Sequence, residues 1–288
     1  NNIEPRINIS YSFNNQSIKA SYNRLNQYLH LISNTSSPTP LDIWVPSGPY
    51  IKPQKLDQFA LGYYTKVKEV KLESEVFYKK IKNRLDYIDG ADLVANDNIE
   101  TVILPGISRA YGMELLLRKN SGRHKYWIAY TLSKSEQKTP GRNSNENGIN
   151  MSKWYNTPYD KTHDFSINSE YNINKKLKIV GNFIFQTGQP TNYPNSQYNY
   201  MNLNVPNYGE RNSQRLPNYH RLDINLTLTP NRNDKKIESS WVFGIYNIYD
   251  RDNASSIIFR RNNETLKNEA VQISIFGIVP SVTYNFKF

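Results

Sequence analysis

The chain has 288 residues, with 36 Lys and Arg against 25 Asp and Glu, a net charge of +11 and no cysteine. The missing cysteines exclude a disulfide framework, thiol catalysis and a cysteine-ligated zinc site. No Lys/Arg block or nucleic-acid-binding signature accompanies the positive charge, and no apolar run approaches the roughly 18 residues of a transmembrane helix. Neither a nucleic-acid partner nor a helical membrane protein is therefore indicated.

Apolar and polar side chains alternate with a period of two along the whole chain, which predicts an all-β protein. In RLDINLTLTP, for example, four aliphatic residues alternate with five polar ones without an exception. About eleven strands are predicted, over residues 5–13, 17–33, 54–67, 70–84, 106–119, 123–138, 160–174, 176–189, 217–230, 237–250 and 269–288. Several are about twice as long as an ordinary strand of five or six residues, as tilted strands that cross a bilayer are.

The connections between these strands alternate strictly between short and long. The short ones are 14–16, 68–69, 120–122, 174–176 and 231–236, and the long ones are 34–53, 85–105, 139–159, 190–216 and 251–268. This parity predicts a transmembrane antiparallel up-and-down β-barrel with tight periplasmic turns and long extracellular loops. Tyr and Trp near strand ends fit the headgroup level of a membrane, although strands are enriched in aromatic residues in general. The mean hydropathy of −0.71 agrees with a barrel, because alternate residues face a polar lumen.

The last predicted strand changes phase. Val271 and Ile273 place apolar side chains at odd positions, whereas Val282 and the residues after it place them at even positions. The change falls across residues 277–280, which include Gly277 and Pro280. Because a β-bulge inserts one residue and exchanges the faces, we expect a bulge there.

Seven segments carry a resemblance to a known family: SRAYGMELLLRK, YTLSKSE, YDKTHDFSI, FQTGQPTNYP, LPNYHRLDINLTLTP, SWVFGIYNIYDRDN and AVQISIFGIVPSVTYNFKF. Their order and spacing resemble the C-terminal half of the β-barrel of TonB-dependent outer-membrane receptors, of the type that carries an N-terminal carboxypeptidase-regulatory-like domain. The resemblance implies that residues 1–288 are the C-terminal part of a barrel of about twenty-two strands, a fragment without the plug and the N-terminal strands. It also implies that Tyr284, Phe286 and Phe288 form the signal read by the barrel-assembly machinery.

The resemblance further implies a function, which is active uptake of a nutrient ligand through the outer membrane of a Gram-negative bacterium, with the long loops extracellular and the C-terminus periplasmic. The implied partners are outer-membrane lipid and lipopolysaccharide, the TonB complex through the missing N-terminal region, the barrel-assembly machinery and a surface lipoprotein. Two alternatives stay open. One is a structural or assembly barrel that binds partner proteins without transport, and the other is a soluble extracellular β-protein that binds glycans through Tyr and Trp. The sequence does not determine the ligand.

No catalytic site is predicted. The four histidines, His30, His124, His163 and His220, are far apart and lack the spacing of a metal site. Glu73 shares a strand face with Glu75, but nothing else of a hydrolase site accompanies this pair. Since G-x-S-x-G, P-loop and Rossmann motifs are also missing from the sequence, we expect no enzyme, no metal and no cofactor.

Polar side chains on the predicted strands are candidate lumen residues that contact a plug or a ligand. They are His163, Asp164, Glu170, Arg221, Asp223 and Asn225. Basic residues of the long loops either keep the loops soluble or contact lipopolysaccharide phosphates or an anionic ligand. They are Arg142, Lys153, Arg211, Arg215, Arg251, Arg260, Arg261 and Lys267.

Overall fold

The computed structural model describes residues 2–32, 43–93, 96–201, 203–230, 238–262, 264 and 268–287. Apart from two short 3₁₀ segments, η1 (Ile99–Thr101) and η2 (Ile149–Ser152), the regular structure is β-strand. Within these ranges no helix is both long enough and apolar enough to cross a membrane.

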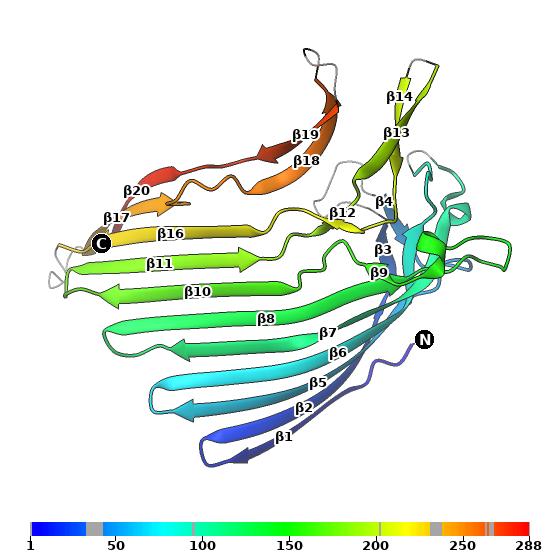
Figure 1. Ribbon diagram of the computed structural model, residues 1–288. Coiled ribbons are helices and arrows are strands. Elements are labelled where there is room, and N and C mark those ends of the chain that lie inside the picture. Colours follow the sequence, from blue (N-terminus) through cyan, green and yellow to red (C-terminus); the bar gives the residue numbers. More distant parts are fainter. Residues whose placement is uncertain are drawn as a thin grey trace.

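The main sheet has 12 strands, of which eleven follow one another in chain order and the twelfth, β9 (Tyr155–Asn156), pairs with β8. The eleven are β1 (Arg6–Phe13), β2 (Gln16–Gln27), β5 (Gln54–Val67), β6 (Val70–Tyr87), β7 (Ile103–Lys119), β8 (His124–Lys138), β10 (His163–Asn172), β11 (Leu177–Gln186), β16 (Tyr219–Leu228), β17 (Glu238–Tyr246) and β20 (Val279–Lys287). Every neighbouring pair is antiparallel, and each of the eleven corresponds to one predicted strand, so the predicted up-and-down order is confirmed. The curved sheet is open, with β1 and β20 at its edges among the described residues (Figure 1).

Four two-stranded sheets lie within or directly beside the connections 34–53, 190–216 and 251–268, which the sequence marks as long. They are β3 (Leu29–Ile32) with β4 (Ile43–Pro46), β12 (Pro190–Thr191) with β15 (Gln214–Arg215), β13 (Pro194–Tyr200) with β14 (Leu203–Tyr208), and β18 (Ala254–Arg261) with β19 (Asn268–Ser274). All four lie toward the end of the main sheet that is opposite the short turns (Figure 1). The predicted division into a short-turn end and a long-connection end is therefore present in the structure.

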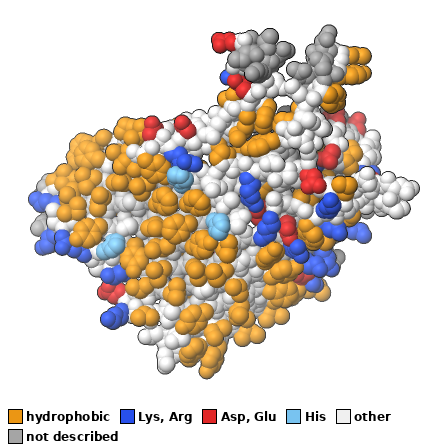
Figure 2. All heavy atoms as spheres, in the orientation of Figure 1, with side chains coloured by type: hydrophobic (Ala, Val, Ile, Leu, Met, Phe, Trp, Pro, Cys, Tyr) orange, Lys and Arg blue, Asp and Glu red, His pale blue; other side chains and the backbone are white. Residues whose placement is uncertain are grey.

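The main sheet has one apolar face. Residues directly opposite each other in antiparallel strands project to the same side, and one such row runs through Leu117, Ile128, Ile167, Phe183 and Leu222. Large hydrophobic side chains on many strands are exposed, and Figure 2 shows them as a broad apolar field with basic side chains at both of its ends. An exposed apolar surface of this extent is typical of a face that meets lipid.

The buried apolar residues lie among the long connections and not between two stacked sheets. One cluster contains Ile32, Val45, Ile51 and Ile103, and another contains Leu104, Ile149 and Tyr155. These clusters hold the connections against the end of the main sheet. A β-sandwich, which packs two sheets over a continuous apolar core, does not have this distribution.

Two predicted strands are interrupted in the structure. The predicted strand over 17–33 divides at Tyr28 into β2 and β3, and the one over 269–288 divides into β19 and β20. The prediction of a bulge at 277–280 is wrong, because β20 pairs with β17 without a register shift while β19 pairs with β18 in a separate sheet. Residues 275–278 connect two independent strands, so each strand takes its own phase.

Candidate functional site

Five of the six candidate lumen residues lie on the polar face of the main sheet. Asp164 and Glu170 belong to β10, and Arg221, Asp223 and Asn225 belong to β16, two strands away. The intervening strand, β11, places its residues in register with both neighbours, which brings the two sets onto one face. The structure thus assembles most of the predicted polar surface, and its contact with a plug or a ligand stays a prediction.

These charges are compensated by neighbouring residues. Glu170 accepts contacts from Lys125 at 3.3 Å and from Lys178 at 3.2 Å. Arg221 pairs with Asp223 at 3.0 Å and lies 4.0 Å from the ring centroid of Tyr246. These charged side chains of the polar face are therefore already paired with other residues of the chain.

His163 lies on the opposite face from Asp164, so the expectation that both face one lumen is wrong. Its ring stacks on Tyr130 with 6.2 Å between centroids, and its Nδ1 lies 2.9 Å from the Tyr130 hydroxyl. The physical reason is the pleat, because successive residues of a strand point to opposite sides and His163 has the same parity as Phe165.

Two residues of the predicted assembly signal are described. Tyr284 packs against Trp241 of β17 with 4.6 Å between ring centroids, and it stacks with Phe286 at 6.0 Å. Phe288 lies outside the described residues, and Lys267 of the predicted basic set does too. Recognition of the C-terminal aromatic residues by assembly machinery stays a prediction.

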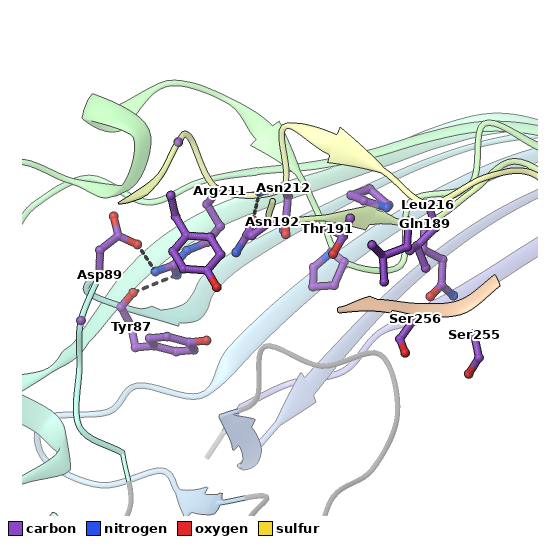
Figure 3. Close-up of a pocket in the computed structure, with 16 residues that line it drawn as sticks. Tyr87, Asp89, Gln189, Thr191, Asn192, Arg211, Asn212, Leu216, Ser255 and Ser256 are labelled. Atoms are coloured by element: carbon purple, nitrogen blue, oxygen red, sulfur yellow. Dashed lines mark hydrogen bonds and ion pairs between the residues drawn. The ribbon is translucent and has the colours of Figure 1, made fainter. Parts of the chain in front are cut away.

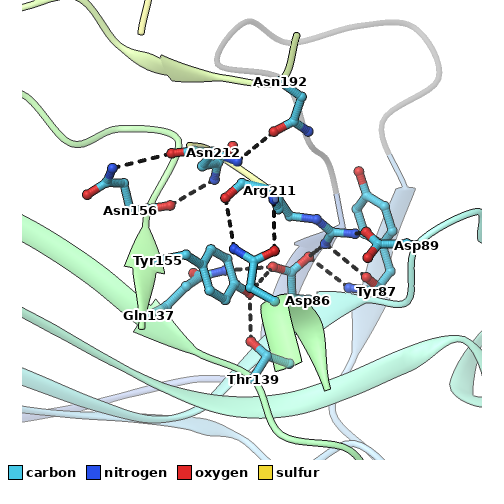
Figure 4. Close-up of polar contacts among 11 residues, drawn as sticks. Asp86, Tyr87, Asp89, Gln137, Thr139, Tyr155, Asn156, Asn192, Arg211 and Asn212 are labelled. Carbon is cyan, nitrogen blue, oxygen red and sulfur yellow. Dashed lines mark hydrogen bonds and ion pairs between the residues drawn. The ribbon is translucent and has the colours of Figure 1, made fainter. Parts of the chain in front are cut away.

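An extensive polar network joins the end of β6 to the β11–β16 connection. Its members, which we name the Arg211 cluster, are Asp86, Tyr87, Asp89, Gln137, Tyr155 and Arg211 (Figure 4). The guanidinium of Arg211 donates to Asp86 at 2.5 Å, to the carbonyl of Tyr87 at 2.9 Å and to Asp89. Its side chain is 5% exposed and that of Asp86 is 10% exposed. This ion pair therefore joins residues that are far apart in the sequence, and both of its side chains are largely shielded from solvent.

Asp86 is the centre of the Arg211 cluster. Besides Arg211, its carboxylate accepts hydrogen bonds from Gln137 Nε2 at 2.6 Å and from the Tyr155 hydroxyl at 2.5 Å. The Tyr155 hydroxyl also lies 2.8 Å from the hydroxyl of Thr139. Strands β6, β8 and β9 thus meet at one carboxylate, which satisfies the rule that a buried charge needs partners.

Asparagine side chains hold the β11–β16 connection beside the Arg211 cluster. Asn150 both accepts from the backbone N–H of Arg211 at 2.8 Å and donates to its carbonyl at 3.0 Å. Asn212 donates to the carbonyl of Asn156 at 2.8 Å, and its N–H donates to Asn192 at 2.5 Å. Asn212 has φ of 54°, a left-handed conformation that asparagine adopts more readily than most residues.

Burial and neighbouring charges shift the pKa values of side chains in the Arg211 cluster. Burial raises the pKa of the Tyr87 hydroxyl to about 12. Burial also raises the pKa of Tyr155, and the carboxylate of Asp86 adds to the effect. Burial lowers the pKa of Arg211, but the charges of Asp86 and Asp89 outweigh it and leave a net increase. Both tyrosines therefore stay protonated and neutral, with the Tyr155 hydroxyl donating to Asp86, and Arg211 stays charged.

A cavity of about 850 Å³ borders the Arg211 cluster (Figure 3). Its wall comes from the end of β6, the β11–β16 connection and β18, and it includes Tyr87, Tyr208 and Leu216. Six of the other thirteen lining residues are uncharged and polar, namely Gln189, Thr191, Asn192, Asn212, Ser255 and Ser256, and the charged side chains of Asp89 and Arg211 also line the cavity. A wall of amides and hydroxyls with aromatic rings suits a polar ligand held by many hydrogen bonds.

Sequence reasoning missed this site because most of its residues lie in segments predicted as loops. Arg211 and Arg215 were expected to keep loops soluble or to contact an anion, but Arg211 is buried and Arg215 pairs with the buried Asp160. The one available signal was composition, since the β11–β16 connection is rich in Asn and Tyr. Among the described residues there is no group of three or more His, Asp or Glu side chains that could hold a metal ion.

His30 in β3 gives a testable pH response at this end of the sheet. Its ring is 1% exposed, with Nε2 2.9 Å from Ser47 Oγ and Nδ1 2.9 Å from Gln54 Nε2. Burial, helped by Arg84, lowers its pKa below the ordinary 6.5. The unfolded hairpin thus binds a proton more readily, so the stability of β3–β4 is retained above pH 6.5 and falls as the pH drops below that value.

We therefore expect faster hydrogen–deuterium exchange in β3 and β4 at pH 5.5 than at pH 7.5, after correction for intrinsic exchange. A His30→Gln variant keeps a polar group at this position without a titrating ring. It should lose the pH response, and an equal response in this variant would contradict the assignment to His30.

Known proteins share this architecture. A family model described as TonB dependent receptor-like, beta-barrel matches residues 1–248, and a comparison with curated proteins finds no match. The ferric-catecholate import receptor Fiu of E. coli K12 superposes with a TM-score of 0.60 at 17% identity, covering 98% of this chain and 34% of that one. The ferripyoverdine receptor of Pseudomonas aeruginosa gives 0.61 at 10% identity, with coverages of 98% and 32%.

The ferric citrate transporter FecA in its unliganded form gives a TM-score of 0.56 at 14% identity, covering 98% of this chain and 37% of that one. The chain thus spans about a third of the length of each of these three structures. At such identities the likeness concerns the fold, and it confirms the predicted partial β-barrel.

Proposed function

Because the chain belongs to the TonB dependent receptor-like β-barrel family, we propose that it forms part of an outer-membrane receptor that takes up a nutrient ligand. On this proposal the short turns are periplasmic and the long connections are extracellular. The chain binds and passes its ligand without changing it chemically. TonB acts through parts of the protein outside this chain, and the barrel-assembly machinery and a surface lipoprotein are further proposed partners.

The cavity beside the Arg211 cluster carries the proposal. It lies among the connections that face outward in this orientation, where a ligand arrives first. Its walls come from segments distant in sequence, and the buried ion pair between Arg211 and Asp86 fixes two of these segments to each other. A rigid polar pocket reduces the entropy that loops lose when they bind a ligand.

The three solved structures compared above are named as ferric-catecholate, ferripyoverdine and ferric citrate proteins. Ferric siderophores are therefore the first probes, and oligosaccharides are the second because the cavity wall is rich in amides and hydroxyls. The experiment measures uptake of both radiolabelled panels by cells that express the full-length protein containing this chain, in strains with and without TonB. We expect uptake of at least one probe that requires both the protein and TonB.

Filling the cavity tests its role directly. Replacing Ser256 of the cavity wall by tryptophan should reduce uptake of that probe at least about tenfold, which corresponds to roughly 1.4 kcal/mol of binding free energy. Ser213→Trp is the matched control, because Ser213 is exposed and belongs to the same end of the molecule without lining the cavity. Uptake that does not depend on TonB, or equal losses in both variants, would overturn the proposal. A protein that assembles fully but takes up neither panel would instead favour a structural barrel.

A further inference from the structure

A row of charged side chains crosses five adjacent strands on the apolar face of the main sheet. Arg24 of β2, Asp57 of β5, Lys80 of β6, Arg109 of β7 and Glu136 of β8 are successive partners in register. We name these five residues the charged row. It lies toward the long-connection end of the strands, whereas the short turns are at the other end.

Two ion pairs within the charged row leave its central lysine without a carboxylate. Arg24 pairs with Asp57 at 2.7 Å and Arg109 pairs with Glu136 at 2.5 Å. Lys80 is exposed and forms no ion pair with any residue that the structure describes.

The next row toward the long connections adds positive charge without a carboxylate. It contains Lys55, Lys82 and Lys138, with Ile107 between the last two. Lys82 is exposed and, like Lys80, forms no salt bridge with a residue that the structure describes, although its charge acts on Asp57 of the charged row. The two rows together are therefore strongly basic.

The rows on the other side of the charged row change character abruptly. The adjacent row contains Tyr22, Phe59, Tyr78 and Tyr111 in register, with Lys134 as its member on β8, and 4.9 Å separates the first two rings and 6.5 Å the last two. The row beyond it is aliphatic and contains Ala20, Leu61, Val76, Met113 and Leu132. Charged, aromatic and aliphatic layers in this order match the profile from lipid headgroups to hydrocarbon.

We propose that the charged row and the lysine row outside it bind the phosphate groups of lipids in the outer leaflet. This inference rests on the orientation given under the proposed function. The basic surface is continuous with the apolar band, so its occupant has an acyl part beside the tyrosines and a phosphate beside Lys80 and Lys82. Ammonium and guanidinium groups both recognise phosphate, and Arg109 is held in place by Glu136 and by Trp154, whose ring centroid lies 4.2 Å away.

The test uses the full-length protein in detergent and a bis-phosphorylated glycolipid as the probe, with native mass spectrometry to count bound lipid. The double variant Lys80→Gln/Lys82→Gln should bind the probe at least about tenfold more weakly, since each basic residue at a membrane surface contributes measurably to anionic lipid binding. The matched control is Lys71→Gln/Lys79→Gln, because those two lysines lie on β6 with opposite parity and therefore on the polar face. The control should bind the probe as the parent does.

Removing both phosphates from the probe should abolish the difference between the double variant and the parent protein. Equal binding by the double variant and the parent, or equal losses in the variant and the control, would refute the proposed lipid site. Both variants change exposed or partly exposed lysines, and heat-modifiable mobility on gels checks that each has folded. Failure of this proposal is distinguishable from failure of the proposed function, because uptake of the radiolabelled probes is measured separately.

Discussion

Replacing Arg211 by methionine is expected to destabilise the junction between the end of β6 and the β11–β16 connection by about 3–5 kcal/mol. The reason is that Asp86 stays buried, at 10% exposure of its side chain, after losing its cationic partner. Hydrogen–deuterium exchange of the full-length protein in detergent should show faster exchange in residues 203–216 and in β9. Uptake through the neighbouring cavity should fall in the same variant.

Two further variants test whether the destabilisation comes from the buried, unpaired charge of Asp86 or from the loss of the arginine side chain itself. Arg142→Met removes an exposed ion pair with Glu146, whose effect should be about 1 kcal/mol or less. Asp86→Asn combined with Arg211→Met should recover part of the lost protection, because the amide still offers an oxygen to Gln137 and Tyr155 but carries no charge. Unchanged exchange in the single Arg211 variant would show that the ion pair does not hold the junction.

Introducing arginine at Ile128 is expected to cost about 2–4 kcal/mol in a bilayer. Ile128 lies on the apolar face, with Leu117 and Ile167 as its partners on the adjacent strands. A charge placed there has to remain in hydrocarbon or pull water and headgroups toward it. The measurement is a denaturant titration of the full-length protein in lipid vesicles, which gives its free energy of unfolding.

Thr131→Arg is the matched control for this test, since Thr131 lies three residues further along β8 on the polar face. Its partners on the two adjacent strands are Glu114 and Asp164, so a new guanidinium there meets two carboxylates. We expect little loss of stability from this variant. A larger loss at Thr131 than at Ile128 would mean that the lipid-facing and interior faces have been assigned the wrong way round.

The local pattern of the sequence determined the strands and their order. Alternation over residues 54–67 predicts a strand that the structure has as β5, Gln54–Val67, and alternating short and long connections predict the antiparallel order that is observed. This succeeds because side-chain alternation is a property of each strand by itself. The same rule, applied strictly, also places His163 with Phe165 on the apolar face.

Only the tertiary structure decided which distant residues meet. Asp86 and Arg211 are separated by 125 positions, and they come together because a buried carboxylate requires a partner wherever the chain can supply one. The charged row likewise depends on register, which fixes Lys80 between Asp57 and Arg109 although no local pattern connects them. Strand periodicity is encoded residue by residue, whereas register and loop packing are set by hydrogen bonds and ion pairs between segments far apart in the sequence.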